Sequence, residues 1–289
     1  MSEFNMVILI SDSGSTKSDW VAIDESGKEL LSFETMGFNP YFHSADLVEA
    51  QLLKSALAVS IAQRVDKVFF YGAGSSSKEL CAVIEDGLSR VFSEADVMVG
   101  HDLNGAAFST WSGEKAITCI LGTGSNSCLF DGESVYEEVP SLAYVLGDEG
   151  SGSWFGKKLL QAYFYKQLPE NIHNDFKKEF GYSANDVNRL VYKEPNPNVF
   201  LASFMKFIGK HKDSELFKSW LVEGFGVFLD IHVKCFEGYQ EMPVHFIGSV
   251  AFHFQDQLKE ACEMRGIHLG NLIKKPIDGL AKYHLECIL

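Results

Sequence analysis

Two segments of the chain share a pattern that restricts the fold more than any other feature. "LISDSGSTKSDWVAID" at residues 9–24 and "CILGTGSNSCLFDG" at residues 119–132 each join an apolar strand to a second strand through a turn of Gly, Ser and Thr. A solenoid or other repeat array needs at least three copies, whereas this chain has two copies, far apart. We therefore expect two halves of similar topology, with a boundary near residues 110–115.

The first half reads as a mixed sheet covered by helices. Three antiparallel strands joined by tight turns are expected over residues 6–35. A long helix with apolar residues at three- and four-residue spacing follows at 47–63, capped by Ser44 or Asp46. Strands at 67–72 and 96–100 then alternate with two further helices, an order that predicts an α/β sheet.

The second half repeats the three-strand start and then differs. A largely helical insert is expected at about 154–238, followed by a strand, a helix at 249–265, a strand and a helical tail. We predict an N-terminal lobe at 1–112, joined by the C-terminal helix 277–289. The C-terminal lobe is predicted at 113–276 and contains the insert.

Composition excludes several classes of protein. With 289 residues, 46% of them hydrophobic, the chain can bury a sizeable core. Its net charge of −14 disfavours nonspecific nucleic-acid binding, which relies on Lys and Arg. The six cysteines form no CxxC pair, the N-terminus has no basic leader region, and no apolar run approaches the roughly 20 residues of a membrane span. We expect a cytoplasmic protein with reduced cysteines that binds neither nucleic acid nor membranes.

The first turn resembles a nucleotide-binding loop without matching either familiar pattern. A P-loop needs GxxxxGK[ST], but Ser11 and Thr16 stand at the glycine positions before Lys17, and the chain continues as a strand. The dinucleotide pattern GxGxxG also fails, because "GTGSNS" and "GAGSSS" lack the third glycine. Neither a P-loop nor Rossmann-type NAD binding is expected, and Lys17 is predicted to begin an ordinary strand.

A phosphate-binding hairpin is the remaining interpretation of the first turn, beside an ordinary polar hairpin. Gly14 allows close approach of the backbone, and Ser15 and Thr16 add hydroxyl donors. Asp12 would repel a polyphosphate unless a cation lay between them, so it is a candidate Mg²⁺ ligand, directly or through water.

The second turn strengthens that interpretation. Gly122, Thr123, Gly124 and Ser125 stand at the matching place in the second half. Two donor-rich turns in two similar halves could hold a phosphate chain from both sides.

Two other strand ends carry candidate residues. Asp102 follows a strand and opens a helix, so it is either an N-cap or a general base that accepts a hydroxyl proton. Gly248 and Ser249 form a small strand-to-helix turn that leaves room for a flat ring such as adenine, or are a plain connection.

The ordered set of motifs resembles the sugar-kinase/Hsp70/actin superfamily over essentially the whole chain. "ISDSGSTKSDW" and "ILGTGSNSCLFDG" resemble its phosphate motifs, "HDLNGAAFS" its first connecting segment, and "VHFIGSVAFHF" its adenosine motif. Within it, "LGDEGSGSWFGKKLL" resembles the BadF/BadG/BcrA/BcrD-type ATPase family, which includes N-acetylglucosamine kinases. The resemblance implies two ribonuclease-H-like lobes of actin/hexokinase type, each a mixed five-stranded sheet with flanking helices, with a cleft between the lobes.

The resemblance also implies roles for individual residues. It makes Asp102 the catalytic base and places Asn39 and Asp148 beside the sugar, although the family's "STN" is here "GFN". A capping role before the helix at Ser153 is the alternative for Asp148. Several relatives carry Gly where Ser13 stands, and a serine there can still donate a hydrogen bond.

Three functions are compatible with the motifs. The favoured one is ATP-dependent phosphorylation of an amino sugar, N-acetylglucosamine first, with Mg²⁺ bridging the phosphates of ATP as co-substrate. Glucosamine and N-acetylmuramic acid remain open as acceptors, and a homodimer is the favoured oligomeric state. An iron–sulfur ATPase activator of a dehydratase or reductase, or a non-catalytic sugar sensor, are the alternatives.

Overall fold

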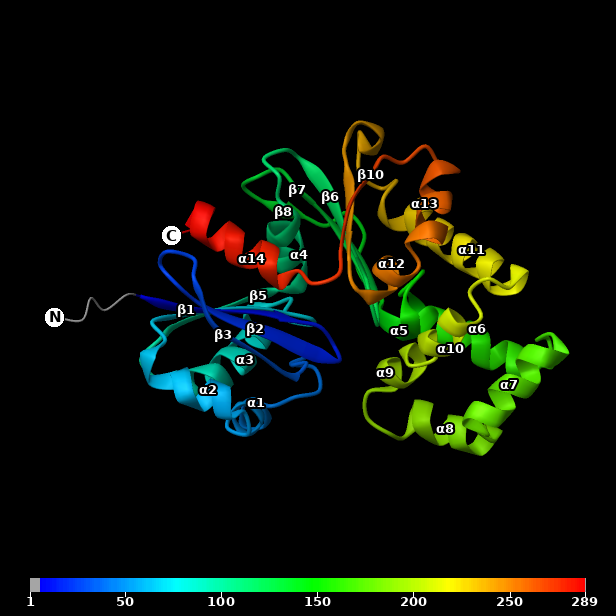
Figure 1. The fold of residues 1–289 in the computed structure, drawn as a ribbon, viewed down its shortest axis with the longest axis horizontal. Helices are drawn as coiled ribbons and strands as arrows, with labels where there is room; N and C mark the ends of the chain where they lie inside the picture. Colours follow the sequence, from blue (N-terminus) through cyan, green and yellow to red (C-terminus); the bar gives the residue numbers. More distant parts are fainter. Residues whose placement is uncertain (1–5, 289) are drawn as a thin grey trace. The chain divides into compact units, whose positions relative to one another are not determined.

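The computed structural model describes residues 6–288 and contains two compact units (Figure 1). The first unit comprises Met1–Glu114 with Lys275–Leu289, and the second comprises Lys115–Lys274. Residues 1–5, where the sequence predicts no leader, and Leu289, the end of the predicted C-terminal helix, lie outside the described residues. Each unit is built on a mixed five-stranded sheet with flanking helices, which confirms the predicted α/β fold class.

The sheet of the first unit has the strand order β3-β2-β1-β4-β5. Its strands are β1 (Val7–Ser13), β2 (Lys17–Asp24), β3 (Glu29–Met36), β4 (Lys67–Gly72) and β5 (Asp96–His101). The first three pair antiparallel, while β4 is parallel to both β1 and β5. In this register Ser13 pairs with Gly72, and Gly72 pairs with His101. The carboxyl ends of three parallel strands therefore finish in one row.

Helices cover both faces of this sheet. They are α1 (Ala45–Leu52), α2 (Ala56–Ile61), η1 (Ala62–Arg64), α3 (Lys78–Val91), α4 (Asp102–Thr110), α14 (Ile277–Tyr283) and η3 (His284–Ile288). Ser44 caps α1, as predicted. The single helix predicted at 47–63 is wrong, because the Ser55 hydroxyl accepts a hydrogen bond from Ala58 N and starts α2 as a separate helix. Serine competes with the helix backbone in this way and favours caps.

The side chains of β1 alternate between the two faces of the sheet and so belong to two different hydrophobic cores. Val7 and Leu9 join the cluster around Trp20 and Phe70, while Ile8 and Ile10 join the one that contains Leu280 of α14. This is the period of two expected of a strand buried on both faces. The C-terminal helix is further fixed by two aromatic contacts. The Tyr71 hydroxyl lies 3.1 Å from His284 Nε2, and the rings of Phe108 and Tyr283 stack at 4.4 Å.

The sheet of the second unit has the order β10-β9-β6-β7-β8. Its strands are β6 (Ala116–Leu121), β7 (Ser125–Phe130), β8 (Val135–Tyr136), β9 (Val244–Ile247) and β10 (Leu269–Ile273). The strands β6, β7 and β8 pair antiparallel, and β9 is parallel to β6 and β10. The two sheets thus have the same topology, as the paired turns predicted.

The predicted helical insert is present between β8 and β9. Its elements are α5 (Ala143–Leu146), α6 (Gly152–Phe164), α7 (Glu170–Phe180), α8 (Ala184–Tyr192), α9 (Pro197–Ala202), α10 (Met205–Lys210), α11 (Glu215–His232) and η2 (Tyr239–Glu241). A phenylalanine-rich core that includes Phe155, Phe176 and Phe225 holds them together.

The prediction of one continuous helix at 249–265 is wrong, although the segment is largely helical. It is divided into α12 (Ser249–His253) and α13 (Gln255–Glu263), because the backbone of Phe254 leaves the helical conformation at φ −119°, ψ 33°. The Phe254 side chain is buried in the core of the unit. Within residues 6–288, no helix has the length and apolar character needed to span a bilayer.

Candidate active site

The first hairpin turn is fixed to the loop that follows β3. Gly14 N donates to Lys17 O at 3.0 Å and closes the turn. The buried Ser13 Oγ accepts hydrogen bonds from Ser18 Oγ at 2.6 Å and from Phe38 N at 3.0 Å. A Cβ atom at Gly37 would lie 2.0 Å from Gly14 O, so only glycine fits there. Ser13 therefore stabilises the turn. Asn39 is the next residue after Phe38, so this contact also holds the backbone beside Asn39 in place.

Asp12 lies in an excess of negative charge. Its side chain is half-buried, and burial raises its pKa to about 7, with Asp19 and Asp102 adding to the rise and Lys17 opposing it. Lys17 Nζ pairs with Asp19 and with Glu34, both at 2.9 Å, so it belongs to β2 and does not act as a P-loop lysine.

A divalent cation fits this electrostatic environment. Mg²⁺ is held in proteins by one or two carboxylates together with substrate phosphates and water. Residues 6–288 contain no group of three or more His, Cys, Asp or Glu side chains that could form a complete metal site. Asp12 would therefore be a single protein ligand, which is the arrangement expected when the nucleotide supplies the others.

Asp102 is the first residue of α4, so the N-cap alternative is wrong, because His101 takes that position. Asp102 Oδ1 lies 3.2 Å from His101 Nε2 but is buried and makes no hydrogen bond with any described residue. Burial raises the pKa of Asp102, and the neighbouring His101 works against that rise. A carboxylate that is held in place and has an elevated pKa can accept a proton.

Asn39 lies against the loop that follows β4. Its Oδ1 accepts a hydrogen bond from Tyr41 N at 3.0 Å, and its backbone N donates to His43 Nδ1 at 3.1 Å. Gly74 has φ +82°, and a Cβ atom there would lie 2.5 Å from Asn39 Oδ1. Of the predicted residues of the first unit, Asp12 lies near the end of β1, Asn39 lies on the loop after β3, and Asp102 begins α4 directly after β5.

The second turn directs two backbone donors away from α6. Gly122 O accepts from Gly152 N at 2.8 Å, and Thr123 O accepts from Ser153 N at 3.0 Å. In a trans peptide the N–H points opposite to the C=O of the same plane. The N–H groups of Thr123 and Gly124 therefore point away from α6, and consecutive donors of this kind form an anion-binding concavity.

Asp148 lies directly behind this turn. It is buried with φ +60°, and its two carboxylate oxygens accept hydrogen bonds from Ser125 N at 3.3 Å and Ser153 Oγ at 3.2 Å. Burial raises the pKa of Asp148. Ser151 is the N-cap of α6, so the capping role considered for Asp148 is wrong. The side chain instead connects the second turn to α6.

Both the backbone N–H and the hydroxyl of Ser125 already make hydrogen bonds within the second unit. Its N–H binds Asp148, and its Oγ donates to Glu149 O at 2.8 Å. Both contacts orient the turn, and they leave the backbone of 122–124 as the part of the turn suited to phosphate.

The predicted adenosine connection adjoins the same turn. Gly248 has φ +106°, and a Cβ atom there would lie 2.5 Å from Leu121 O and 3.3 Å from Gly122 N. Ser249 is exposed and begins α12. Gly248 is therefore required for the close approach of this connection to the end of β6.

Sequence reasoning missed a second set of residues in the first unit. A hollow of about 550 Å³ is lined by Ser75, Ser77, His101 and Asn104, among others. The sequence signal for this loop is the run "GAGSSS", which does not match the dinucleotide motif.

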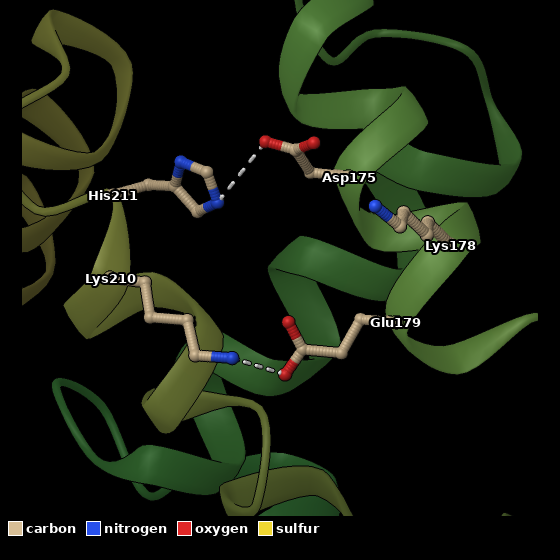
Figure 2. A pocket seen from close by; sticks show the side chains of 5 residues that line it. All are labelled: Asp175, Lys178, Glu179, Lys210 and His211. Carbon is tan, nitrogen blue, oxygen red and sulfur yellow. Dashed lines mark hydrogen bonds and ion pairs between the residues drawn. The ribbon is translucent and has the colours of Figure 1, made fainter.

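Another hollow lies between α7 and α10 in the second unit (Figure 2). No predicted site residue lines it. Its charged side chains pair with each other, Lys210 with Glu179 at 2.7 Å and His211 with Asp175 at 3.8 Å (Figure 2). Exposed pairs of this kind need no ligand to balance their charge.

Comparison with known proteins defines the class. No family model matches the chain, and no curated protein sequence matches it. Among solved structures, a ROK-family glucokinase from Streptomyces griseus, in complex with glucose and AMPPNP, is 15% identical with a TM-score of 0.59, over 96% of this chain and 97% of that one. A dehydratase component A from Acidaminococcus fermentans is 10% identical with a TM-score of 0.52, over 97% and 96%. The chain has the two-lobed sugar-kinase fold.

A third structure defines the family. A Porphyromonas gingivalis protein, provisionally assigned as an N-acetylglucosamine kinase, is 38% identical with a TM-score of 0.90, over 98% of this chain and 100% of that one. The chain belongs to the family of this protein. Its narrower resemblance to the BadF/BadG/BcrA/BcrD-type ATPases stays a prediction.

Proposed function

We propose that this protein is an ATP-dependent sugar kinase whose acceptor is an amino sugar, N-acetylglucosamine first, phosphorylated on its 6-hydroxyl. The observation that carries the proposal is the Asp102 carboxylate at the start of α4, whose pKa burial raises and whose Oδ1 lies 3.2 Å from His101 Nε2. The choice of N-acetylglucosamine is supported by the 38% identical relative.

The reaction assigns a separate task to each predicted group. Asp102 accepts the proton of the sugar hydroxyl. At the same time the oxygen of that hydroxyl forms a bond to the γ-phosphorus of ATP. The bond from that phosphorus to the β–γ bridging oxygen breaks, and ADP leaves. The N–H groups of Thr123 and Gly124, together with the turn 14–16, stabilise charge on the phosphates. Gly248 and Ser249 would border the adenosine.

Mg²⁺, when bound, neutralises phosphate charge and polarises the transferred group. Asp12 would hold it, directly or through water, and binding a cation there removes the cost of the crowded carboxylates Asp12, Asp19 and Asp102.

An assay of ADP release tests the proposal across N-acetylglucosamine, glucosamine, N-acetylmuramic acid and glucose. Asp102→Asn is expected to lower kcat by about 10²- to 10⁴-fold, the range for loss of a general base. The exposed Asp86, which pairs with Arg90, gives the matched control Asp86→Asn. Full activity of Asp102→Asn would exclude it as the base, and absence of sugar-dependent ADP release from the wild type would overturn the kinase proposal.

The environment of the cysteine thiols does not favour the alternative function, an iron–sulfur ATPase activator of a dehydratase or reductase. Cys119 and Cys128 are buried in the second unit, and burial raises the pKa of Cys119. Protonated thiols inside a core do not suit a cluster that needs thiolate ligands. Iron and sulfide in anaerobically purified protein would reverse this preference.

A further inference from the structure

The loop between β3 and α1 contains a buried histidine that makes two hydrogen bonds with Asn39. His43 is 7% exposed, and its Nδ1 accepts a hydrogen bond from Asn39 N at 3.1 Å. The backbone N of His43 in turn donates to Asn39 O at 2.9 Å. The segment 39–43 is therefore closed by two hydrogen bonds, and one of them depends on the imidazole ring.

The other hydrogen bonds of Asn39 determine which group it can offer a ligand. Its O also accepts from Phe42 N at 3.0 Å, and its Oδ1 accepts from Tyr41 N at 3.0 Å. The backbone and the amide oxygen are thus used within the loop, so the Nδ2 amide is the group that Asn39 can offer a ligand. The bond to Tyr41 N also fixes the plane of this amide.

The loop is anchored on both sides of the segment 39–43. Phe38 N donates to Ser13 Oγ at 3.0 Å, and Ser44 caps α1 by accepting from Leu47 N. Because both ends are fixed, we expect a change confined to residues 39–43 to reorient the Asn39 amide without unfolding β3 or α1.

The contact with Asn39 determines the protonation state of the His43 ring. A backbone N–H can only donate, so Nδ1 is the unprotonated nitrogen, and the hydrogen of the neutral ring lies on Nε2. A protonated ring carries a hydrogen on both nitrogens, and its Nδ1–H would face the N–H of Asn39. Only the neutral ring can therefore make this contact.

The surroundings of His43 favour the neutral ring. Burial lowers the pKa of His43. The acidic residues that follow it on α1, Asp46 and Glu49, pair with Arg90 at 2.7 and 3.2 Å. The ring is therefore neutral at pH 7 and takes up a proton only as the pH falls below about 6.5, the ordinary value for histidine.

We propose that His43 is a positioning residue for Asn39, and that the loop presents the Asn39 amide to the acceptor sugar only while the His43 ring is neutral. The inference rests on the proposed function and adds a residue that the sequence motifs do not mark. It also makes sugar binding depend on pH through a side chain that does not touch the sugar.

Calorimetric titration of the full-length protein with N-acetylglucosamine, without nucleotide, tests the role of His43. His43→Leu removes the acceptor and should weaken the sugar Kd about five- to tenfold at pH 8, the effect of one neutral hydrogen bond, with the KM for ATP unchanged. His43→Asn is the conservative variant, because its Oδ1 replaces the imidazole Nδ1 and accepts a hydrogen bond at every pH. It should keep the wild-type Kd at pH 8.

The pH dependence separates positioning from a purely structural role. Between pH 8 and pH 5.5, above the pI of about 5.1, the wild-type Kd should weaken relative to that of His43→Asn, toward the limit set by His43→Leu. Comparing the two proteins cancels the titration of carboxyl groups, which is common to both. His268→Asn, at an exposed histidine, is the matched control and should follow the wild type at both pH values.

Nuclear magnetic resonance tests the geometry without any ligand. In long-range proton–nitrogen spectra at pH 8, the ring signals that disappear in His43→Asn should show an unprotonated Nδ1 and a protonated Nε2. A hydrogen on Nδ1 would overturn the proposal.

The remaining outcomes separate this inference from the proposed function. An unchanged sugar Kd in His43→Leu, or parallel pH profiles of the wild type and His43→Asn, overturns the role of His43 while kinase activity of the wild type stands. Sugar binding without ADP release, weakened in His43→Leu, supports the role of His43 and removes the kinase reaction. If the wild type binds no sugar, the inference is overturned.

Discussion

Replacing Gly74 by alanine would test whether the loop after β4 positions Asn39. Gly74 has φ +82°, in the left-handed region that only glycine adopts freely. Its missing side chain also provides space, because a Cβ atom would lie 2.5 Å from Asn39 Oδ1. Gly74→Ala therefore combines a backbone penalty with displacement of a predicted sugar contact.

The two effects can be estimated separately. Forcing an L-residue into the left-handed region costs about 1–2 kcal/mol. Displacing Asn39 breaks the hydrogen bond from Tyr41 N to its Oδ1, worth about 1 kcal/mol. The expected loss of unfolding free energy for Gly74→Ala is thus about 2–3 kcal/mol. Because the predicted role of Asn39 is a contact to the acceptor sugar, the sugar Kd should rise by about tenfold, or about 1.4 kcal/mol.

Gly113→Ala is the matched control for the backbone penalty. Gly113 has φ +92° and belongs to the same unit, but a Cβ atom there meets no atom within 4 Å. It should lose about 1–2 kcal/mol and keep the wild-type sugar affinity. Scanning calorimetry would measure both variants, and the extra contact loss in Gly74→Ala corresponds to about 2–4 °C in Tm.

Equal Tm shifts for the two variants would show that the contact between Gly74 and Asn39 contributes nothing. A larger shift for Gly74→Ala with an unchanged sugar Kd would keep the packing argument but remove Asn39 from the sugar site. A raised KM for ATP in place of the sugar effect would contradict the assignment of this loop.

Two further predictions concern ionisation and packing. Since the Asp12 pKa is raised to about 7 in the folded protein, its carboxyl binds more protons folded than unfolded, and stability falls as pH rises from about 4 to about 7. Asp12→Asn should remove this decline in stability. The urea midpoint of the variant should lie above that of the wild type at pH 8 and equal it at pH 4. Parallel pH profiles of the two proteins would contradict the raised pKa of Asp12. A Cβ atom at Gly156 would lie 2.0 Å from Leu201 O, so Gly156→Ala should separate α6 from α9 and lower Tm by several degrees. Gly209→Ala, whose nearest contact is 3.7 Å, should instead raise Tm slightly because alanine favours helix; equal shifts would refute the packing argument.

The sequence allowed the fold class to be predicted because its strongest signals are local. The apolar runs of β1 and β6, and the Gly/Ser/Thr turns after them, identify the paired strands without any tertiary information. The helix boundaries were less predictable. At Ser55 and Phe254 the helical spacing of apolar residues continues, but the backbone does not remain helical.

The candidate site was predictable only in part, because strand register is a long-range property. The alignment of Ser13, Gly72 and His101 in one row depends on pairing between strands far apart in sequence. This row is what places the loop after β4 and the start of α4 at the same end of the sheet. No local pattern marked Ser75 as different from the serines that follow it. Similarly, the motif placed Asp148 near the sugar, while its bonds to Ser125 and Ser153 depend on how α6 meets the second turn.

The cost of the unpaired groups supports a functional reading of the first unit. Ser75 Oγ and Asp102 Oδ1 are both buried, and neither hydrogen-bonds to another described residue. Each such group costs about 1–3 kcal/mol, a substantial fraction of the stability of a typical domain. Ser75 follows the carboxyl end of β4, and Asp102 follows that of β5, where its Oδ1 lies 3.2 Å from His101 Nε2. A role in stability alone does not account for a buried hydroxyl and a buried carboxylate oxygen that lack hydrogen bonds, and for Asp102 the proton transfer that we propose gives a reason.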